Sequence, residues 1–185
     1  MKKWWACSLI AMLSLVSLPS WAGKSGSDGL LISYALMRFD TEVDGPHLGS
    51  GKTLNNYGDL KIGWMKDKLY VGGIYSVSTQ ESNNSERKRT LYGASLGYHN
   101  EGYFIDGSYF FSGQLEVSPA TYRKASGYGI DLGYDYMFTS NLFFGLELSY
   151  KSYTFAEYES PGGTIQEDNK VKSELYPMIV LGVNF

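Results

Sequence analysis

The residues able to carry covalent chemistry are few and lie in polar segments. His47 has Asp44 and Ser50 near it in the sequence, and Glu81 and Ser82 form a second polar group. A histidine with a serine and a carboxylate is the set used for nucleophilic catalysis, in which the serine attacks and the histidine is the base. No local motif fixes such a geometry around either group. We therefore predict no catalytic residues.

The sequence also has few residues that could bind a transition metal. The chain has two histidines, and its single cysteine, Cys7, lies within the first 22 residues. Two histidines far apart in the sequence cannot build an ordinary transition-metal site. We expect no metal and no cofactor.

The N-terminus has the features of a secretory signal peptide. Lys2 and Lys3 are followed by an apolar run over residues 4–18 and by the small-residue site Ser20-Trp21-Ala22, and cleavage is expected after residue 22. The run is shorter than the roughly 20 apolar residues of a membrane-spanning helix. Loss of Lys2 and Lys3 from the 16 basic residues leaves 14 against 19 acidic ones, so the formal charge is −5. This balance disfavours nucleic acid as a partner.

Residues 23–185 form one expected domain, which contains eight runs of alternating apolar and polar residues. The expected strands are residues 30–40, 54–66, 69–79, 87–99, 103–117, 126–138, 142–158 and 170–185. Each is at least as long as the roughly 9–11 residues that cross a bilayer at a tilt. The pattern predicts an all-β fold, an eight-stranded antiparallel up-and-down transmembrane β-barrel.

Short and long connections alternate along the chain. The tight turns are residues 67–68, 100–102 and 139–141, and the long polar loops are residues 41–53, 80–86, 118–125 and 159–169. Short periplasmic turns alternating with longer outer loops are typical of bacterial outer-membrane barrels. An even number of strands then leaves both chain ends in the periplasm.

The tight turns also predict which side chains face outward, because opposite residues of an antiparallel hairpin share a face. They pair Trp64 with Val71, Tyr98 with Ile105, and Tyr136 with Phe144. Outward aromatic residues then form two girdles, one of Trp64, Tyr98, Tyr103, Phe138 and Phe185 and one of Tyr75, Tyr109, Phe111, Tyr128 and Tyr150. In the alternative, a soluble barrel, these rings would point inward.

This pattern resembles the small eight-stranded outer-membrane barrels of the outer membrane protein A and X type. The resemblance covers nearly all of residues 23–185 and includes the final strand, where Leu181, Val183 and Phe185 alternate up to a terminal aromatic residue. That ending looks like the signal that the barrel-assembly machinery of this group binds as an added β-strand. The resemblance therefore implies the assembly machinery as a partner. The absence of a domain after Phe185 argues against a peptidoglycan anchor.

The same alternation places charged residues on the inward face. They are Asp59, Lys61, Asp106, Asp131, Asp135, Glu147, Lys151, Lys172 and Glu174. Eight strands enclose a space that side chains can fill, and an unpaired buried charge is costly. Lys151 lies diagonally from Asp131, and Asp59 and Lys61 share one strand face, so we expect a salt-bridged plug. The alternative is a gated proton or ion path.

Basic residues gather where strands emerge at the outer face. They are Lys52, Arg87, Lys88, Arg89, Arg123 and Lys124, with Lys170 at the start of the last strand. Guanidinium groups bind phosphate oxygens bidentately, so these residues are candidates for contact with lipopolysaccharide. The alternative is that they are only solvated.

We expect a monomeric, non-enzymatic, porin-like protein of a Gram-negative outer membrane. Its role would be structural, in envelope integrity, or in adhesion and lipopolysaccharide binding through its loops. One alternative is a lipid A-modifying acyltransferase or deacylase at the outer rim, because some small barrels have these activities; Pro177 removes a ladder donor from the last strand, which could open a lateral gap. The other alternative is a narrow ion or proton channel.

Overall fold

The computed structural model describes residues 28–43, 51–82, 85–160, 162–170 and 173–185. The expected signal peptide lies outside these residues, as do Asp44, His47 and Ser50. Within the described part of the chain, no helix is long and apolar enough to cross a membrane.

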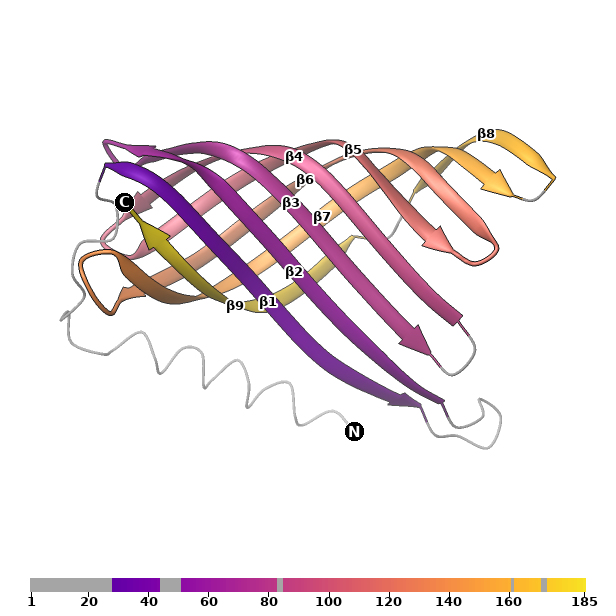
Figure 1. Ribbon diagram of the computed structural model, residues 1–185, viewed down its shortest axis with the longest axis horizontal. Coiled ribbons are helices and arrows are strands. Elements are labelled where there is room, and N and C mark those ends of the chain that lie inside the picture. Colours follow the sequence, from indigo (N-terminus) through magenta and orange to yellow (C-terminus); the bar gives the residue numbers. More distant parts are fainter. Residues whose placement is uncertain (1–27, 44–50, 83–84, 161, 171–172) are drawn as a thin grey trace.

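The alternating runs form a closed ring of antiparallel strands (Figure 1). The strands are β1 (Gly29–Val43), β2 (Gly51–Lys66), β3 (Leu69–Ser82), β4 (Ser85–Asn100), β5 (Tyr103–Val117), β6 (Ala120–Met137), β7 (Leu142–Ser160), β8 (Gly163–Lys170) and β9 (Glu174–Asn184). β9 pairs with both β1 and β7 and closes the ring. β9 pairs with the first part of β7, and β8 pairs with the last part of β7. β8 and β9 therefore lie one after the other beside β7 and together act as the eighth strand of the ring. The prediction of an eight-stranded antiparallel barrel is confirmed.

Several strands are longer than the sequence predicts, and the polar loops are correspondingly shorter. The expected loop 118–125 is reduced to a turn at Ser118-Pro119, because β6 already begins at Ala120. Most of the expected loop 159–169 is β8. These segments are polar on both faces, so alternation of apolar and polar residues did not reveal them as strands.

The predicted hairpin registers are confirmed. Trp64 lies opposite Val71, Tyr98 opposite Ile105, and Tyr136 opposite Phe144. Two of the three tight turns have two central residues with positive φ, which are Asp67 and Lys68 in one and Glu101 and Gly102 in the other. Such turns match the twist of the strands they join and hold them in one register. The three tight turns and the two ends of the ring, Gly29 and Asn184, lie at one end of the barrel, the turn end; the opposite end is the hairpin end (Figure 1).

The outside of the barrel is apolar. Outward residues such as Trp64 and Leu96 are 59% and 61% exposed, whereas Tyr70 and Phe110 on the inward face are fully buried. Nine of the ten predicted girdle residues are exposed aromatic side chains, and Tyr150 is half-buried. A water-soluble barrel would present the opposite arrangement. The outward belt fits lipid.

The inside of the barrel is filled. One apolar cluster includes Leu31, Met65, Tyr70 and Phe143, and a second includes Leu91 and Phe110. The remaining interior side chains are largely polar or charged, and they form the candidate site.

Candidate functional site

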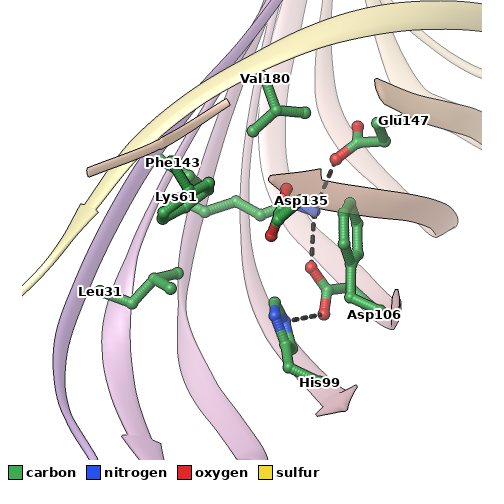
Figure 2. Close-up of a pocket in the computed structure, with 10 residues that line it drawn as sticks. Leu31, Lys61, His99, Asp106, Asp135, Phe143, Glu147 and Val180 are labelled. Atoms are coloured by element: carbon green, nitrogen blue, oxygen red, sulfur yellow. Dashed lines mark hydrogen bonds and ion pairs between the residues drawn. The ribbon is translucent and has the colours of Figure 1, made fainter. Parts of the chain in front are cut away.

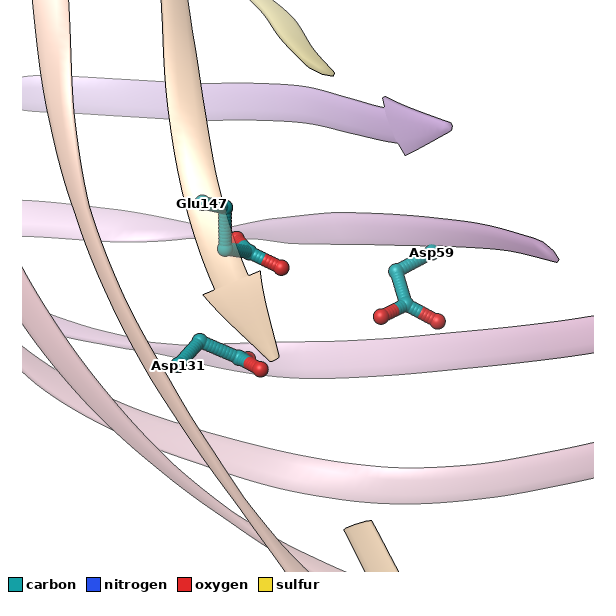
Figure 3. Close-up of side chains that lie close together, drawn as sticks. All are labelled: Asp59, Asp131 and Glu147. Atoms are coloured by element: carbon teal, nitrogen blue, oxygen red, sulfur yellow. The ribbon is translucent and has the colours of Figure 1, made fainter. Parts of the chain in front are cut away.

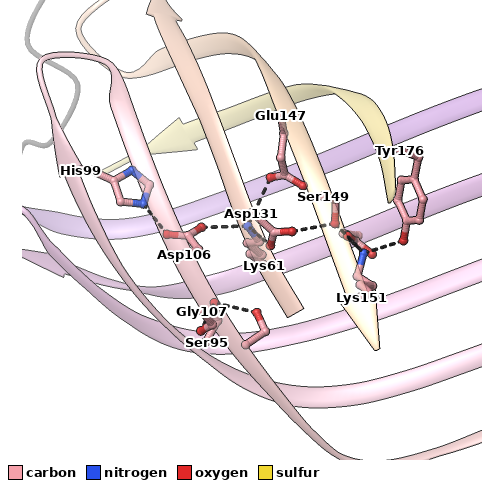
Figure 4. Close-up of polar contacts among 12 residues, drawn as sticks. Lys61, Ser95, His99, Asp106, Gly107, Asp131, Glu147, Ser149, Lys151 and Tyr176 are labelled. Carbon is pink, nitrogen blue, oxygen red and sulfur yellow. Dashed lines mark hydrogen bonds and ion pairs between the residues drawn. The ribbon is translucent and has the colours of Figure 1, made fainter. Parts of the chain in front are cut away.

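Lys61 is the centre of the interior charge network (Figure 4). Its Nζ atom lies 2.8 Å from Asp106 Oδ2, 2.8 Å from Asp131 Oδ2 and 3.2 Å from Glu147 Oε2. These carboxylates come from β5, β6 and β7, and Lys61 reaches them from β2. One ammonium group therefore connects four strands through the middle of the barrel.

His99 extends the network toward the turn end. Its Nε2 atom lies 3.0 Å from Asp106 Oδ1, and its ring stacks on Phe104 with 5.2 Å between the centroids. Asp106 thus has one oxygen on Lys61 and the other on His99. His99 is the last residue of the expected strand 87–99, but the sequence did not assign it to the network.

A second cationic centre, Lys151 of β7, joins the network on the other side of Asp131. Lys151 Nζ pairs with Asp59 and donates hydrogen bonds to Tyr176 Oη at 2.8 Å and to Ser149 Oγ at 3.1 Å. Ser149 Oγ in turn donates to Asp131 Oδ1 at 2.6 Å. The ion-pair partner of Lys151 is therefore Asp59, from a strand across the barrel, rather than Asp131 as the diagonal placement suggested.

Arg89 forms a third centre, which corrects one assignment made from sequence. We expected Arg89 at the outer surface, but its side chain points into the barrel and the residue is 2% exposed. Arg89 Nη1 pairs with Glu174 and donates to Tyr153 Oη at 2.6 Å, and the guanidinium lies 4.7 Å from the Tyr153 ring centroid. The physical reason is alternation: Arg89 lies two residues from Leu91 within the same strand, so both side chains point inward, whereas the assignment to the surface grouped Arg89 with its exposed neighbours Arg87 and Lys88.

A small cavity lies beside Lys61 and His99 and is lined also by Asp135 and Glu147 (Figure 2). Its volume of about 10 Å³ is room for about one water molecule. Asp135 is 2% exposed, and its Oδ1 atom has no hydrogen-bond partner within the described residues. Asp135 is thus inside the barrel as predicted, and it joins none of the ion pairs formed among the described residues.

Asp59, Asp131 and Glu147 form a compact carboxylate cluster (Figure 3). One oxygen from each lies within 4.8 Å of the other two. Oxygen ligands at such spacing suit hard cations, but the positive charge among these groups is already supplied by the ammonium groups of Lys61 and Lys151. The geometry therefore describes an internal salt-bridge network.

The remaining candidate residues fall into four groups. Arg87, Lys88, Arg123 and Lys124 are exposed near the hairpin end; Lys172 and the side chains of Lys52 and Lys170 lie outside the described part. Arg123 Nε lies 2.8 Å from Glu159, and Lys124 pairs with Glu157. Glu81 and Ser82 are exposed at the end of β3. Leu181 and Phe185 face outward, and the backbone of Phe185 exchanges hydrogen bonds with Leu30.

Sequence reasoning missed the phenol groups that complete the network. Tyr153 and Tyr176 are buried and bind Arg89 and Lys151. Alternation in β7 and β9 places both residues on the inward face, so their orientation was predictable. Tyr176 and Lys151 lie on the neighbouring strands β9 and β7. The partner of Tyr153, Arg89, comes from β4, which is not a neighbour of β7 in the ring, and no local pattern identifies that pair.

Comparison with known proteins supports the fold. No protein-family model and no curated protein sequence matches the chain. The solved structure of Neisserial surface protein A is similar with a TM-score of 0.54 and 17% identity, and the match covers 88% of this chain and 99% of that chain. The outer membrane protein OmpT of Vibrio cholerae matches with a TM-score of 0.37 and 15% identity, and the match covers 88% of this chain and 54% of that chain. The β domain of the Bordetella autotransporter BrkA matches with a TM-score of 0.39 and 14% identity, and the match covers 84% of this chain and 68% of that chain. The chain has the fold of a small outer-membrane β-barrel.

Proposed function

We propose that this protein is an integral outer-membrane barrel that supports the envelope structurally and contacts lipopolysaccharide at its outer rim, without enzymatic activity. The observation that carries the proposal is the belt of exposed apolar side chains around an interior of paired charges. Lipid is the environment in which that arrangement is stable, because the apolar side chains face the hydrocarbon and the paired strands satisfy their backbone hydrogen bonds within the ring. We place the turn end in the periplasm.

Lipopolysaccharide contact is proposed for the exposed basic residues of the hairpin end, which we call the basic collar: Arg87, Lys88, Arg123 and Lys124. Arg123 and Lys124 are paired with Glu159 and Glu157. Arg87 and Lys88 take part in no ion pair within the described residues, so they are the members of the collar most available to phosphate.

Cysteine labelling of intact cells tests the location and the orientation. Because the single natural cysteine, Cys7, lies in the expected signal peptide, one introduced cysteine gives an unambiguous signal. Glu116→Cys near the hairpin end should react with a membrane-impermeant maleimide. Glu101→Cys in a tight turn should react only after the outer membrane is permeabilised. The reverse pattern would refute the orientation, and labelling of neither residue after permeabilisation would refute the location.

Lipopolysaccharide binding tests the collar. Arg87→Gln combined with Lys88→Gln should weaken binding of purified protein to lipopolysaccharide by about tenfold, as expected for the loss of charge-assisted hydrogen bonds of about 1.5–3 kcal/mol. The matched control is Lys66→Gln combined with Lys68→Gln at the turn end, which should leave binding unchanged. Equal binding by both double variants would argue against the collar.

A further inference from the structure

The ring is paired incompletely between its first and last strands. The β1–β9 ladder runs from Leu31 opposite Asn184 to Leu36 opposite Ile179 and then stops. Within the described residues, β1 from residue 37 to residue 39 pairs only with β2, and β9 from residue 176 to residue 178 pairs only with β7. We call this unpaired stretch the open seam. It begins where β1 and β9 diverge toward the hairpin end (Figure 1).

Pro177 explains where the ladder stops. Leu30 and Phe185 exchange both backbone hydrogen bonds, at 3.1 and 2.9 Å. In an antiparallel ladder such pairs recur at every second residue, so the next ones include Leu36 with Ile179 and then Arg38 with Pro177. Proline has no backbone N–H to donate. The next hydrogen-bonded pair of the ladder would therefore lack one of its two backbone hydrogen bonds, which accounts for the start of the seam at Pro177.

The seam borders the apolar belt. Leu175 on β9 faces outward and is 64% exposed, and Ile179 lies on the same outward face. On β1, outward residues change from apolar Leu36 to charged Arg38, which is exposed. Unpaired strand edges are not stable in the hydrocarbon region unless something covers their polar groups. A molecule that covers the seam must therefore combine apolar and polar parts.

Groups suited to an anion and to apolar matter lie on the inner side of the seam. The Tyr57 ring stacks on Tyr176, with centroids 4.3 Å apart, and on Phe39 of β1. Arg89 pairs with Glu174 of β9, but its Nε and Nη2 atoms are buried without a hydrogen-bond partner within the described residues. These two N–H groups form one edge of the guanidinium fork, which matches two oxygens of a phosphate.

We propose that the open seam is a lateral binding site for a phosphorylated glycolipid of the outer leaflet, with lipid A as the chemical class. Its acyl chains lie against Leu175 and Ile179 outside the barrel. Its phosphorylated headgroup enters between the strand edges, held by Arg38 at the rim and by the free edge of Arg89 inside. The proposal rests on the proposed function, because the hairpin end must face the outer leaflet.

Restoring the missing backbone donor tests the proposal directly. Pro177→Val lets the ladder extend to Arg38 and should close the seam, so binding of bisphosphorylated lipid A to the protein in nanodiscs should weaken by about tenfold. The amide at position 177 should at the same time become protected from hydrogen exchange. The matched control is Ile179→Val on the same strand and face, which should bind lipid A like the wild type.

A second variant tests the anion contact without altering the strand edge. Arg89→Lys keeps the charge and the pairing with Glu174 but removes the fork, and it should also weaken binding of lipid A. This variant keeps the proposal testable if Pro177→Val does not fold. Lipid A from which both phosphates have been removed should bind weakly to every variant; tight binding of it by the wild type would overturn the phosphate assignment.

The outcomes separate this proposal from the proposed function. If wild type, Pro177→Val and Arg89→Lys all bind lipid A equally, the seam site is refuted while lipopolysaccharide contact at the collar stands. If the wild type binds no lipid A or lipopolysaccharide, both proposals fail. A wild-type dimer that Pro177→Val converts to a monomer would refute the lipid site in favour of strand addition by a second copy at the free edge of β1.

Discussion

Lys61 illustrates how a single side chain supports the interior. Its ammonium group lies among the carboxylates of Asp106, Asp131 and Glu147. Lys61→Met would leave these charges buried without their common partner, and the loss of one partner of a buried ion pair costs about 3–5 kcal/mol. We expect the free energy of unfolding, measured by urea titration in lipid vesicles, to fall by that amount.

Lys66→Met is the matched control, because Lys66 is on the same strand but exposed. It should leave the unfolding midpoint nearly unchanged. Adding Asp131→Asn to Lys61→Met should recover part of the lost stability, since it removes one of the stranded charges. A Lys61→Met variant as stable as the wild type would show that the network contributes specificity rather than stability.

At the residue scale, alternation predicts which face a side chain occupies but not its partner. Asp59, Lys61 and Lys151 were placed inside from their strands alone. Lys151 pairs with Asp59 because ring closure brings β7 and β2 to face each other across the lumen, which no pairwise hairpin rule describes. Arg89 was misplaced because it was grouped with the neighbouring basic residues Arg87 and Lys88, although alternation within the expected strand 87–99 puts it on the same inward face as Leu91.

At the element scale, two adjacent glycines of β3 should respond oppositely to the same change. A Cβ on inward Gly72 would lie 2.5 Å from the Ile62 carbonyl oxygen and 2.3 Å from Tyr70 Oη, whereas a Cβ on outward Gly73 would meet nothing closer than 3.8 Å. Gly72→Ala should therefore destabilise the barrel by about 1–3 kcal/mol, as overpacking does. Gly73→Ala should be neutral or slightly stabilising.

Urea unfolding of the two variants side by side measures this difference, and each serves as the control for the other. Equal destabilisation would mean that strand propensity, rather than close packing of β3 against β2, limits stability. The sequence predicts which glycine faces inward. It does not predict that Tyr70 leans over Gly72, because that depends on how side chains fill the lumen.

Strand prediction succeeded where a lipid-facing belt forces one face to be apolar, and it failed beyond that belt. The tight turns at Asp67 and at Glu101 fixed the registers of their hairpins exactly as residue pairing requires. β8 and the first part of β6 were missed because their sequences, such as Gln166-Glu167-Asp168-Asn169, do not alternate apolar and polar residues. Pro177 marks the opposite case, since its missing donor is visible in the sequence and the ladder stops beside it.

At the scale of the whole molecule, the filled interior predicts that the barrel is a poor conductor. Lys61, Arg89 and Lys151 each cross the lumen to carboxylates on other strands, and aromatic side chains such as Phe110 are fully buried in an apolar cluster inside the barrel. Moving an ion through would require breaking buried ion pairs, which is costly because it leaves charges without their partners. We expect purified protein in planar bilayers to show no current or very small currents, with protein-free bilayers as the baseline. Large, steady single-channel currents would contradict the plug and favour the ion-path alternative, in which the same side chains act as a gate.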